Sequence, residues 1–269
     1  MNWYRVRSLV KKDIREVLQM KMVVLPMIVV PLLLCIAIPA VLTILGYTQG
    51  VAMMSGVDMI EKAIPLYPIP EGLEKLEVKI LFIFLNYSFL PLFMVIPVMV
   101  SSIITANSVV GEKERKTLET LLYTPITNRE FIAAKLFGSF IPGYILTVTG
   151  FIFYFLVVNG ISLYFDGIML VQSPVWVPGI ILFAPALSLL GLSVTLMVSM
   201  KAKTYMEAQQ MSAFIVIPLV LLIVLQVTGL VIFNPLYVLL AAVAVFVLDY
   251  FLISRLAPRF SREGIVTRL

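Results

Sequence analysis

The chain has 269 residues, of which 61% are hydrophobic and only 13% are charged, and its net charge is +5. Soluble domains are roughly 45–50% apolar and about 25% charged, so this composition excludes a water-soluble domain and indicates an integral membrane protein. There is no histidine and a single cysteine, Cys35, which excludes an intrachain disulfide, a metal site built on these ligands and a Ser–His catalytic pair. The chain also lacks the GxxxxGK[ST] pattern of a P-loop. We therefore expect no catalytic residue, no cofactor and no metal in this chain.

The N-terminal residues 2–20 have the pattern of an amphipathic helix, because apolar residues recur at every third or fourth position. These apolar residues are Trp3, Val6, Val10, Ile14, Val17 and Leu18. A basic amphipathic helix that ends in an aromatic residue and precedes an apolar stretch is typical of a helix in the membrane interface. The alternative is a simple positively charged flank that sets the topology.

Two apolar stretches in the first half of the chain exceed the length of about 18 residues that a spanning helix needs. The first covers residues 22–46 and the second residues 80–106. Pro91 and Pro97 lie inside the second stretch and predict kinks. Residues 47–79 form a predicted extracellular loop that is too short to be a folded receptor domain.

Four further apolar stretches follow in the second half of the chain. They cover residues 131–158, 175–200, 211–233 and 236–254. Only the dipeptide Asn234–Pro235, a turn signal, separates the last two. The sequence therefore predicts an all-α integral membrane protein with six transmembrane helices in a single domain, residues 1–269.

The basic residues indicate how the chain is oriented. Six spans place both termini on the same side of the membrane. Of the 20 Lys and Arg residues, all but Lys62, Lys75 and Lys79 lie on that side. Basic residues mark the cytoplasmic side, so the termini and the loop between spans two and three are predicted to be cytoplasmic. Basic residues beside the spans also suit anionic lipids, and the net charge requires no nucleic-acid partner.

One charged stretch interrupts the apolar sequence near its middle: GEKERKTLETLLYTPITNREFIAAKL, residues 111–136. Its first part has a helical pattern that Pro125 ends, because the residue before a proline is pushed out of the helical region. Thr127 and Glu130, three residues apart, predict a capping box for a second helix. Residues 110–130 are thus predicted to contain a cytoplasmic helix and a defined turn. The alternative is an ordinary hairpin whose charges serve solubility and topology.

This stretch resembles the signature of the ABC-2 type permeases, the membrane subunits of type V ABC exporters, in which the pattern is close to GEKERGTLExLLxTPxxxxExxxxK. The matching residues are Gly111, Glu112, Lys113, Glu114, Arg115, Thr117, Leu118, Glu119, Leu122, Thr124, Pro125, Glu130 and Lys135. Lys116 departs from the pattern, since many members have glycine there. The predicted N-terminal interfacial helix and the six spans agree with the same family.

The resemblance implies a permease that exports a substrate across the cell membrane of a prokaryote. It also implies two partners, which are a second permease, identical or related, and a separate nucleotide-binding ATPase that carries ATP and Mg. Residues 111–135 would transmit closure of the ATPase dimer to the spans. The coupling residues inferred in this way are Glu112, Glu114, Arg115, Thr117, Leu118, Glu119, Thr124, Pro125, Arg129 and Glu130.

Two roles are open for the charged residues of this coupling segment. Glu112, Glu114, Arg115 and Glu119 either contact the ATPase or form buried ion pairs that hold the segment to the spans. The leucines of the same stretch suit packing under the bundle better than contact with the partner.

Few polar residues lie inside the predicted spans, and they are candidates for a translocation path or for hydrogen bonds between helices. These candidates are Asn86, Tyr87, Asn107 and Gln226. Asp249 is the one clearly ionisable residue within a span. It lies near the predicted cytoplasmic end, where we expect it to pair with a Lys or Arg.

Two other classes of protein remain as alternatives. A secondary transporter or channel not driven by ATP should show polar residues at mid-membrane and often an inverted repeat, and the sequence shows no repeat. An intramembrane enzyme needs a catalytic set, which the chain lacks. No row of charges crosses the membrane, which argues against an ion-coupled carrier and favours a lipid-like or amphipathic cargo.

Overall fold

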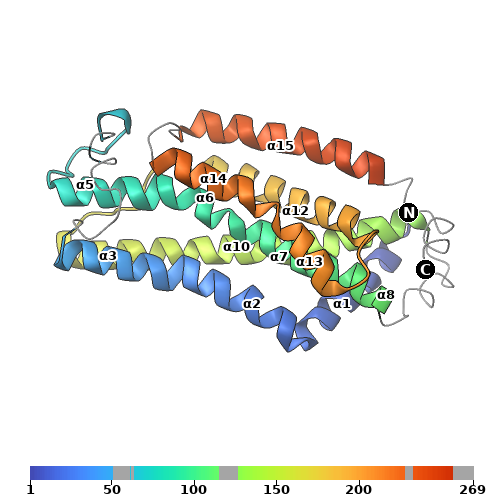
Figure 1. Ribbon diagram of the computed structural model, residues 1–269. Coiled ribbons are helices and arrows are strands. Elements are labelled where there is room, and N and C mark those ends of the chain that lie inside the picture. The colour runs from blue at the N-terminus through green and yellow to red at the C-terminus, as the bar shows by residue number, and fades with distance from the viewer. Residues whose placement is uncertain (51–60, 62–63, 115–126, 228–232, 257–269) are drawn as a thin grey trace.

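A computed structural model describes residues 1–50, 61, 64–114, 127–227 and 233–256. Within these residues every regular element is helical, and six helical runs are long and apolar enough to cross a membrane. Figure 1 shows the runs side by side in an elongated bundle, with the N-terminus at one end. We call this end the N-terminal end and the opposite one the distal end. The predicted all-α architecture with six spans is confirmed.

The chain begins with helix α1 (Trp3–Gln19), which lies before the first spanning run. The backbone leaves the helical region at Met20, with φ −97° and ψ 97°, so the chain turns there. The first run then consists of α2 (Lys21–Leu32), the π-helical turn η1 (Leu33–Ala37) and α3 (Ile38–Thr48).

The second run extends over 39 residues, Leu76–Glu114, and the short turn η3 (Ile64–Leu66) precedes it. Its segments are α5 (Leu76–Ile83), η4 (Phe84–Ser88), α6 (Phe89–Phe93), α7 (Val95–Ala106), η5 (Asn107–Gly111) and α8 (Glu112–Glu114). Figure 1 shows the run changing direction between α6 and α7, where Met94 lies midway between Pro91 and Pro97. The run continues past residue 106, so the coupling segment begins as part of it.

The third run is a single helix, α10 (Asn128–Asp166), which extends well beyond the predicted residues 131–158. It ends at Gly167, whose φ of 69° is the left-handed conformation that glycine adopts without strain. At about 1.5 Å per residue the helix is longer than the roughly 30 Å hydrocarbon layer. The first part of residues 159–174, which lie between the predicted third and fourth spans, is therefore helical.

The remaining three runs lie beside α10 and the second run. They consist of α11 (Trp176–Pro178), η6 (Gly179–Phe183) and α12 (Ala184–Ser199), then α13 (Tyr205–Ala213) and α14 (Val216–Val227), and finally α15 (Pro235–Leu256). The fifth run begins at Tyr205 rather than at residue 211, because the Thr204 hydroxyl accepts a hydrogen bond from the Glu207 N–H and caps a polar first turn.

The second run forms the core of the bundle. In its most apolar stretch 83% of the residues are buried, against 61% in the fourth run and 17–22% in the other four. Helices α7 and α12 approach closely, since a Cβ added to Gly191 would lie 2.8 Å from the Val98 carbonyl oxygen. Gly143 of α10 lies against Ser101 and Ser188 in a similar way. Small residues at such contacts are typical of helices packed in membranes.

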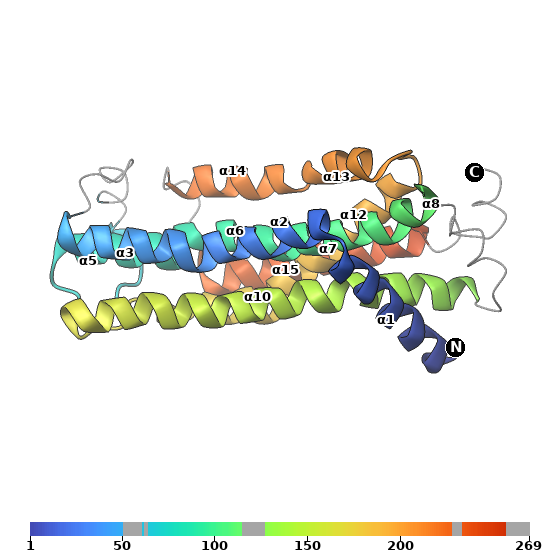
Figure 2. The ribbon, with the colours of Figure 1, turned by 90° about the horizontal axis from the view of Figure 1, so that it is seen from below.

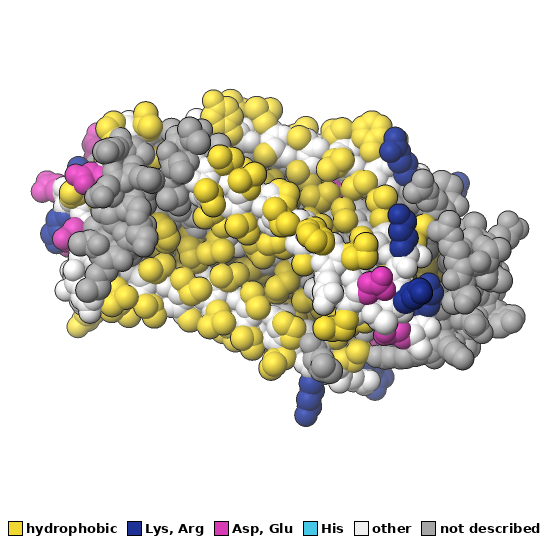
Figure 3. All heavy atoms as spheres, viewed as in Figure 1, with side chains coloured by type: hydrophobic (Ala, Val, Ile, Leu, Met, Phe, Trp, Pro, Cys, Tyr) yellow, Lys and Arg dark blue, Asp and Glu magenta, His cyan; other side chains and the backbone are white. Residues whose placement is uncertain are grey.

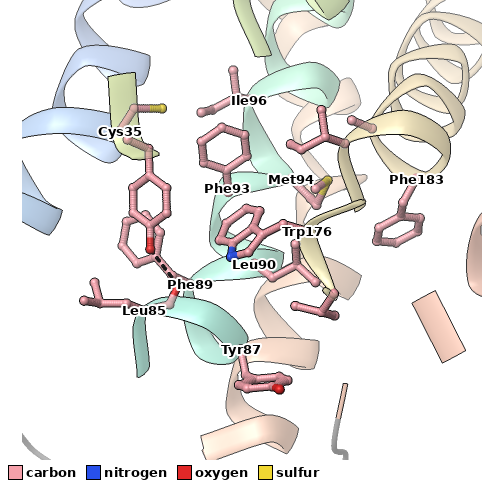
Figure 4. Close-up of a cluster of buried hydrophobic side chains, with 14 of the residues drawn as sticks. Cys35, Leu85, Tyr87, Phe89, Leu90, Phe93, Met94, Ile96, Trp176 and Phe183 are labelled. Atoms are coloured by element: carbon pink, nitrogen blue, oxygen red, sulfur yellow. Dashed lines mark hydrogen bonds between the residues drawn. The ribbon is translucent and has the colours of Figure 1, made fainter. Parts of the chain in front are cut away.

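Aromatic side chains join the second, third and fourth runs (Figure 4). Trp176 meets Phe93 edge-on with ring centroids 5.5 Å apart, and Phe89 stacks on Tyr154 at 5.3 Å. The Tyr154 hydroxyl donates a hydrogen bond of 2.6 Å to the Leu85 carbonyl. The polar end of this buried tyrosine is therefore satisfied.

The surface agrees with a bundle embedded in lipid. In the view of Figure 3, apolar side chains cover the middle of the bundle and charged side chains gather at its two ends. An apolar band between two polar ends is what the hydrocarbon layer requires.

Candidate coupling site

A buried lysine joins three helical segments at the N-terminal end of the bundle. Lys135, near the start of α10, is 1% exposed. Its ammonium group donates hydrogen bonds to Asp13 Oδ2 of α1 at 2.9 Å, to Glu112 Oε2 of α8 at 3.0 Å and to the backbone oxygen of Ser108 at 2.7 Å. We call Lys135, Asp13, Glu112 and the neighbouring Lys12 the hub.

Lys12 lies on the more exposed side of the hub. Its ammonium group is 2.6 Å from Glu112 Oε1 and 3.5 Å from Glu16. The buried carboxylate of Glu112 is thus held between two ammonium groups, one from α1 and one from α10. Buried charges persist when they are paired and hydrogen-bonded, and each carboxylate oxygen of Glu112 has such a partner.

Burial and neighbouring charges set the protonation of the hub. Burial raises the pKa of Asp13 above its usual 3.8, and although the Lys135 ammonium opposes this, the Glu112 carboxylate adds to it. Burial alone would lower the pKa of Lys12, but its hydrogen bond to Glu112 and the nearby carboxylates raise that pKa above 10.5. Asp13 is therefore easier to protonate than an ordinary carboxyl, whereas Lys12 holds its proton firmly.

Three carboxylates lie together in and beside the hub. Asp13, Glu16 and Glu112 have oxygens within 4.8 Å of one another. However, the ammonium groups of Lys12 and Lys135 lie among these oxygens and already supply positive charge. The residues therefore fit an ion-pair network and do not fit a site for a divalent cation.

Glu130 fastens the first residues of the chain to the start of α10. The predicted capping box is present, since Glu130 N–H donates to the Thr127 hydroxyl and the Glu130 carboxylate accepts from Thr127 N–H at 3.0 Å. The same carboxylate accepts from Asn2 N–H at 2.6 Å and lies 3.9 Å from the Arg5 guanidinium. Helix α1 is thus held to α10 at Glu130 as well as at the hub.

Glu114 connects the coupling segment to the fifth run. Its carboxylate accepts a hydrogen bond of 3.1 Å from the backbone N–H of Tyr205, the first residue of α13. The first N–H groups of a helix have no partner within the helix and favour negative charge. Glu114 therefore stabilises the start of α13 and joins it to α8.

The π-helical turn that leads into the hub is closely packed at Gly111. A Cβ added to Gly111 would lie 2.9 Å from the side-chain oxygen of Asn107. Both residues belong to η5, and both are buried. Asn107, a candidate for the translocation path, thus lies at the entrance to the coupling segment.

A sequence profile of the ABC-2 family transporter proteins matches residues 7–254. The chain belongs to this family. No curated protein matches the chain, and no solved structure matches it. The matched range extends from α1 to α15 and therefore includes the four hub residues. Such membrane components associate with an ATP-binding subunit and have no P-loop of their own.

Four of the coupling residues inferred for the ABC-2 permease lie in the described part of the chain. Glu112, Glu114 and Glu130 lie at contacts between helices, and Arg129 is exposed on α10. Of the two roles left open for Glu112, the structure shows the buried ion pair. The inferred residues outside the described part of the chain are Arg115, Thr117, Leu118, Glu119, Thr124 and Pro125.

Asn86 and Tyr87 of the permease lie in η4 and form hydrogen bonds with residues just before α11. The Asn86 amide donates to the Leu170 carbonyl at 2.8 Å and accepts from Ser173 N–H at 3.2 Å. The Tyr87 hydroxyl accepts from the Ser173 hydroxyl at 3.0 Å. Contacts that hold the segment before α11 to the second run account for both residues.

Gln226 and Asp249 are each 2% exposed. Within the described residues, the Asp249 carboxylate has no hydrogen-bond partner, and the Gln226 amide has only the Tyr67 hydroxyl nearby as a partner. The expected pairing of Asp249 with a Lys or Arg is therefore wrong for this part of the permease. The reason is its position on the buried face of α15, together with Val238 and Ala242.

Sequence reasoning missed the part that α1 plays in the site. Asp13 follows Leu9 and precedes Val17 at intervals of four residues, and all three are buried. An acidic residue on the apolar face of a helix needs a partner. This signal, together with Lys135 in the family motif, would have indicated the ion pair.

Proposed function

We propose that this ABC-2 permease is the transmembrane subunit of an ATP-driven exporter and that residues 111–135 couple it to a separate ATP-binding subunit. The observation that supports the proposal most strongly is the 3.0 Å ion pair between Glu112 and Lys135. It fastens the two ends of the coupling segment to each other and to α1.

The contacts of the hub and of Glu114 could transmit a displacement of the coupling segment to three helices. Force applied to the coupling segment reaches α10 through Lys135, α1 through Asp13 and α13 through Glu114. Separating one partner from a buried ion pair is strongly unfavourable in a medium of low dielectric constant, although one carboxylate oxygen of Asp13 has no hydrogen-bond partner within the described residues. The three helices are therefore expected to move together when the ATP-binding subunits close.

The same proposal includes the orientation of the chain in the membrane and its partners. The N-terminal end of the bundle faces the cytoplasm, and α1 lies in the membrane interface of a prokaryotic cell membrane. ATP and Mg bind to the partner subunit, and a second permease, identical or related, completes the translocation path.

A secondary transporter or channel remains the alternative function. It is favoured by Asp249, because an ionisable group buried inside a span is typical of ion and proton pathways. The family match supports the ATP-driven exporter instead.

The direct test is purification of the chain from its native membranes in mild detergent, followed by identification of the proteins that co-elute in stoichiometric amount. We expect a P-loop ATPase, and we expect Arg115→Glu with Glu119→Lys to remove it. A matched double variant at the distal end, Glu71→Lys with Lys79→Glu, should retain it. A chain that elutes alone would favour the carrier or channel.

A further inference from the structure

Helix α1 has a basic stripe opposite its buried face. Val6, Leu9, Asp13 and Val17 face the bundle. Arg7, Lys11 and Arg15 are exposed and lie four residues apart, which places them in a line along one side of the helix. Within the described residues none of the three forms an ion pair. At about 1.5 Å per residue the stripe is roughly 12 Å long.

The acidic residues of α1 do not neutralise this stripe. Asp13 is buried against Lys135, and Glu16 lies 3.5 Å from Lys12. Both carboxylates of the helix are thus engaged in or beside the hub. The exposed side therefore presents positive charge alone.

Exposed apolar side chains lie beside the stripe. Trp3, Tyr4 and Leu18 are 62%, 81% and 60% exposed. The helix turns at Met20 directly into the first spanning run, and Figure 2 shows it slanting away from the bundle, with its N-terminal end outside the row of spanning helices. Exposed aromatic and basic residues next to a spanning helix are typical of the headgroup region of a bilayer.

We propose that Arg7, Lys11 and Arg15 bind the headgroups of anionic phospholipids in the leaflet on the N-terminal side. Charge complementarity and the continuity of α1 with the first span support lipid over an acidic protein surface. Because Asp13 on the opposite face belongs to the hub, bound lipid would also hold α1 against the coupling segment. The lipid contact itself does not depend on ATP-driven export.

The test uses the full chain, purified in mild detergent and titrated with phosphatidylglycerol or phosphatidylcholine. The apparent affinity is taken from the dependence of Tm on lipid concentration. The three side chains are replaced together in Arg7→Gln, Lys11→Gln, Arg15→Gln. A basic residue near an anionic surface contributes roughly fivefold in affinity, so the triple variant should bind phosphatidylglycerol roughly a hundredfold more weakly. Its Tm without added lipid should be unchanged.

Two controls make the result specific. The charge-conserving triple Arg7→Lys, Lys11→Arg, Arg15→Lys should bind phosphatidylglycerol as the natural chain does. Lys201→Gln with Lys203→Gln, exposed lysines elsewhere in the chain, should also retain most of the preference.

Three outcomes would overturn the proposal. The first is a neutral triple variant that still prefers phosphatidylglycerol. The second is a charge-conserving triple variant that loses the preference. The third is a neutral triple variant that releases the ATP-binding subunit while lipid binding is unchanged, because the stripe would then be a protein-binding surface.

Discussion

The ammonium group of Lys135 lies 2.9 Å from the carboxylate of Asp13 although 122 residues separate them in the chain, and both side chains are 1% exposed. The contact joins the N-terminal helix to the helix that follows the coupling segment. Since Glu112 shares the same ammonium group, one side chain holds three parts of the chain together. The hub is therefore expected to be sensitive to the loss of this one cation.

Replacement of Lys135 with methionine would leave Asp13 buried without its hydrogen-bonded cation, beside Glu112, which would keep its ion pair with Lys12. Removal of one partner from a buried ion pair costs about 3–5 kcal/mol, so Lys135→Met should lower the Tm of the purified chain strongly. Arg129→Met, an exposed position on the same helix, should have little effect. Addition of Asp13→Asn and Glu112→Gln should restore part of the lost stability, and an unchanged Tm for Lys135→Met alone would contradict the account.

The pH dependence of stability should report the buried Asp13. Its pKa is raised above 3.8 in the folded chain, chiefly by burial. The folded state therefore binds the proton more tightly than the unfolded state, and the stabilising contribution of Asp13 is complete below pH 3.8 and is lost as the pH rises through the raised pKa.

The measurement compares Tm for the natural chain and Asp13→Asn, which cannot titrate at this position, between about pH 3 and pH 8. The stability of the natural chain relative to the variant should decrease with rising pH within that window and be constant above it. A relative stability that increases with pH would show that the Lys135 ion pair outweighs burial.

The sequence predicted the spans well and the hub only in part. Apolar length defines a spanning helix, and the Thr127–Glu130 capping box is a local contact that spacing reveals. The contact of Asp13 with Lys135 is not local, because it depends on how α1 packs against α10. The extension of α10 to Asp166 was missed. The length of an apolar stretch indicates which residues lie in the hydrocarbon layer, but a helix can continue beyond that layer.

Asn86 should hold the segment before α11 in place. Asn86→Leu would leave the Ser173 N–H and the Trp176 indole N–H without the acceptor they have at 3.2 and 3.3 Å, and the Leu170 carbonyl would keep only the Gln172 N–H as a donor among the described residues. Each unsatisfied buried group costs about 1–3 kcal/mol. Hydrogen exchange measured by mass spectrometry should accelerate in residues 168–175. Gln226→Leu changes a buried amide that lies near the Tyr67 hydroxyl and makes no hydrogen bond with residues 168–175, so it should leave this exchange unchanged. Equal exchange rates in both variants would contradict the role of Asn86.

Asp249 should reduce the stability of the bundle. Both carboxylate oxygens are buried without a hydrogen-bond partner in the described part of the chain. A buried polar group without a partner is unfavourable by roughly 1–3 kcal/mol, so Asp249→Leu should raise Tm in detergent and Asp249→Asn should raise it less. A fall in Tm for Asp249→Leu would indicate a partner that the folded chain needs.

The central claim, that residues 111–135 meet the ATP-binding subunit, is tested most directly by cross-linking in native membranes. The single natural cysteine, Cys35, is buried, so an added cysteine is the one that reacts. We predict that Glu119→Cys forms a covalent adduct with a P-loop ATPase through a short bifunctional reagent, and that Lys75→Cys at the distal end forms none. An adduct from Lys75→Cys without one from Glu119→Cys would contradict the account.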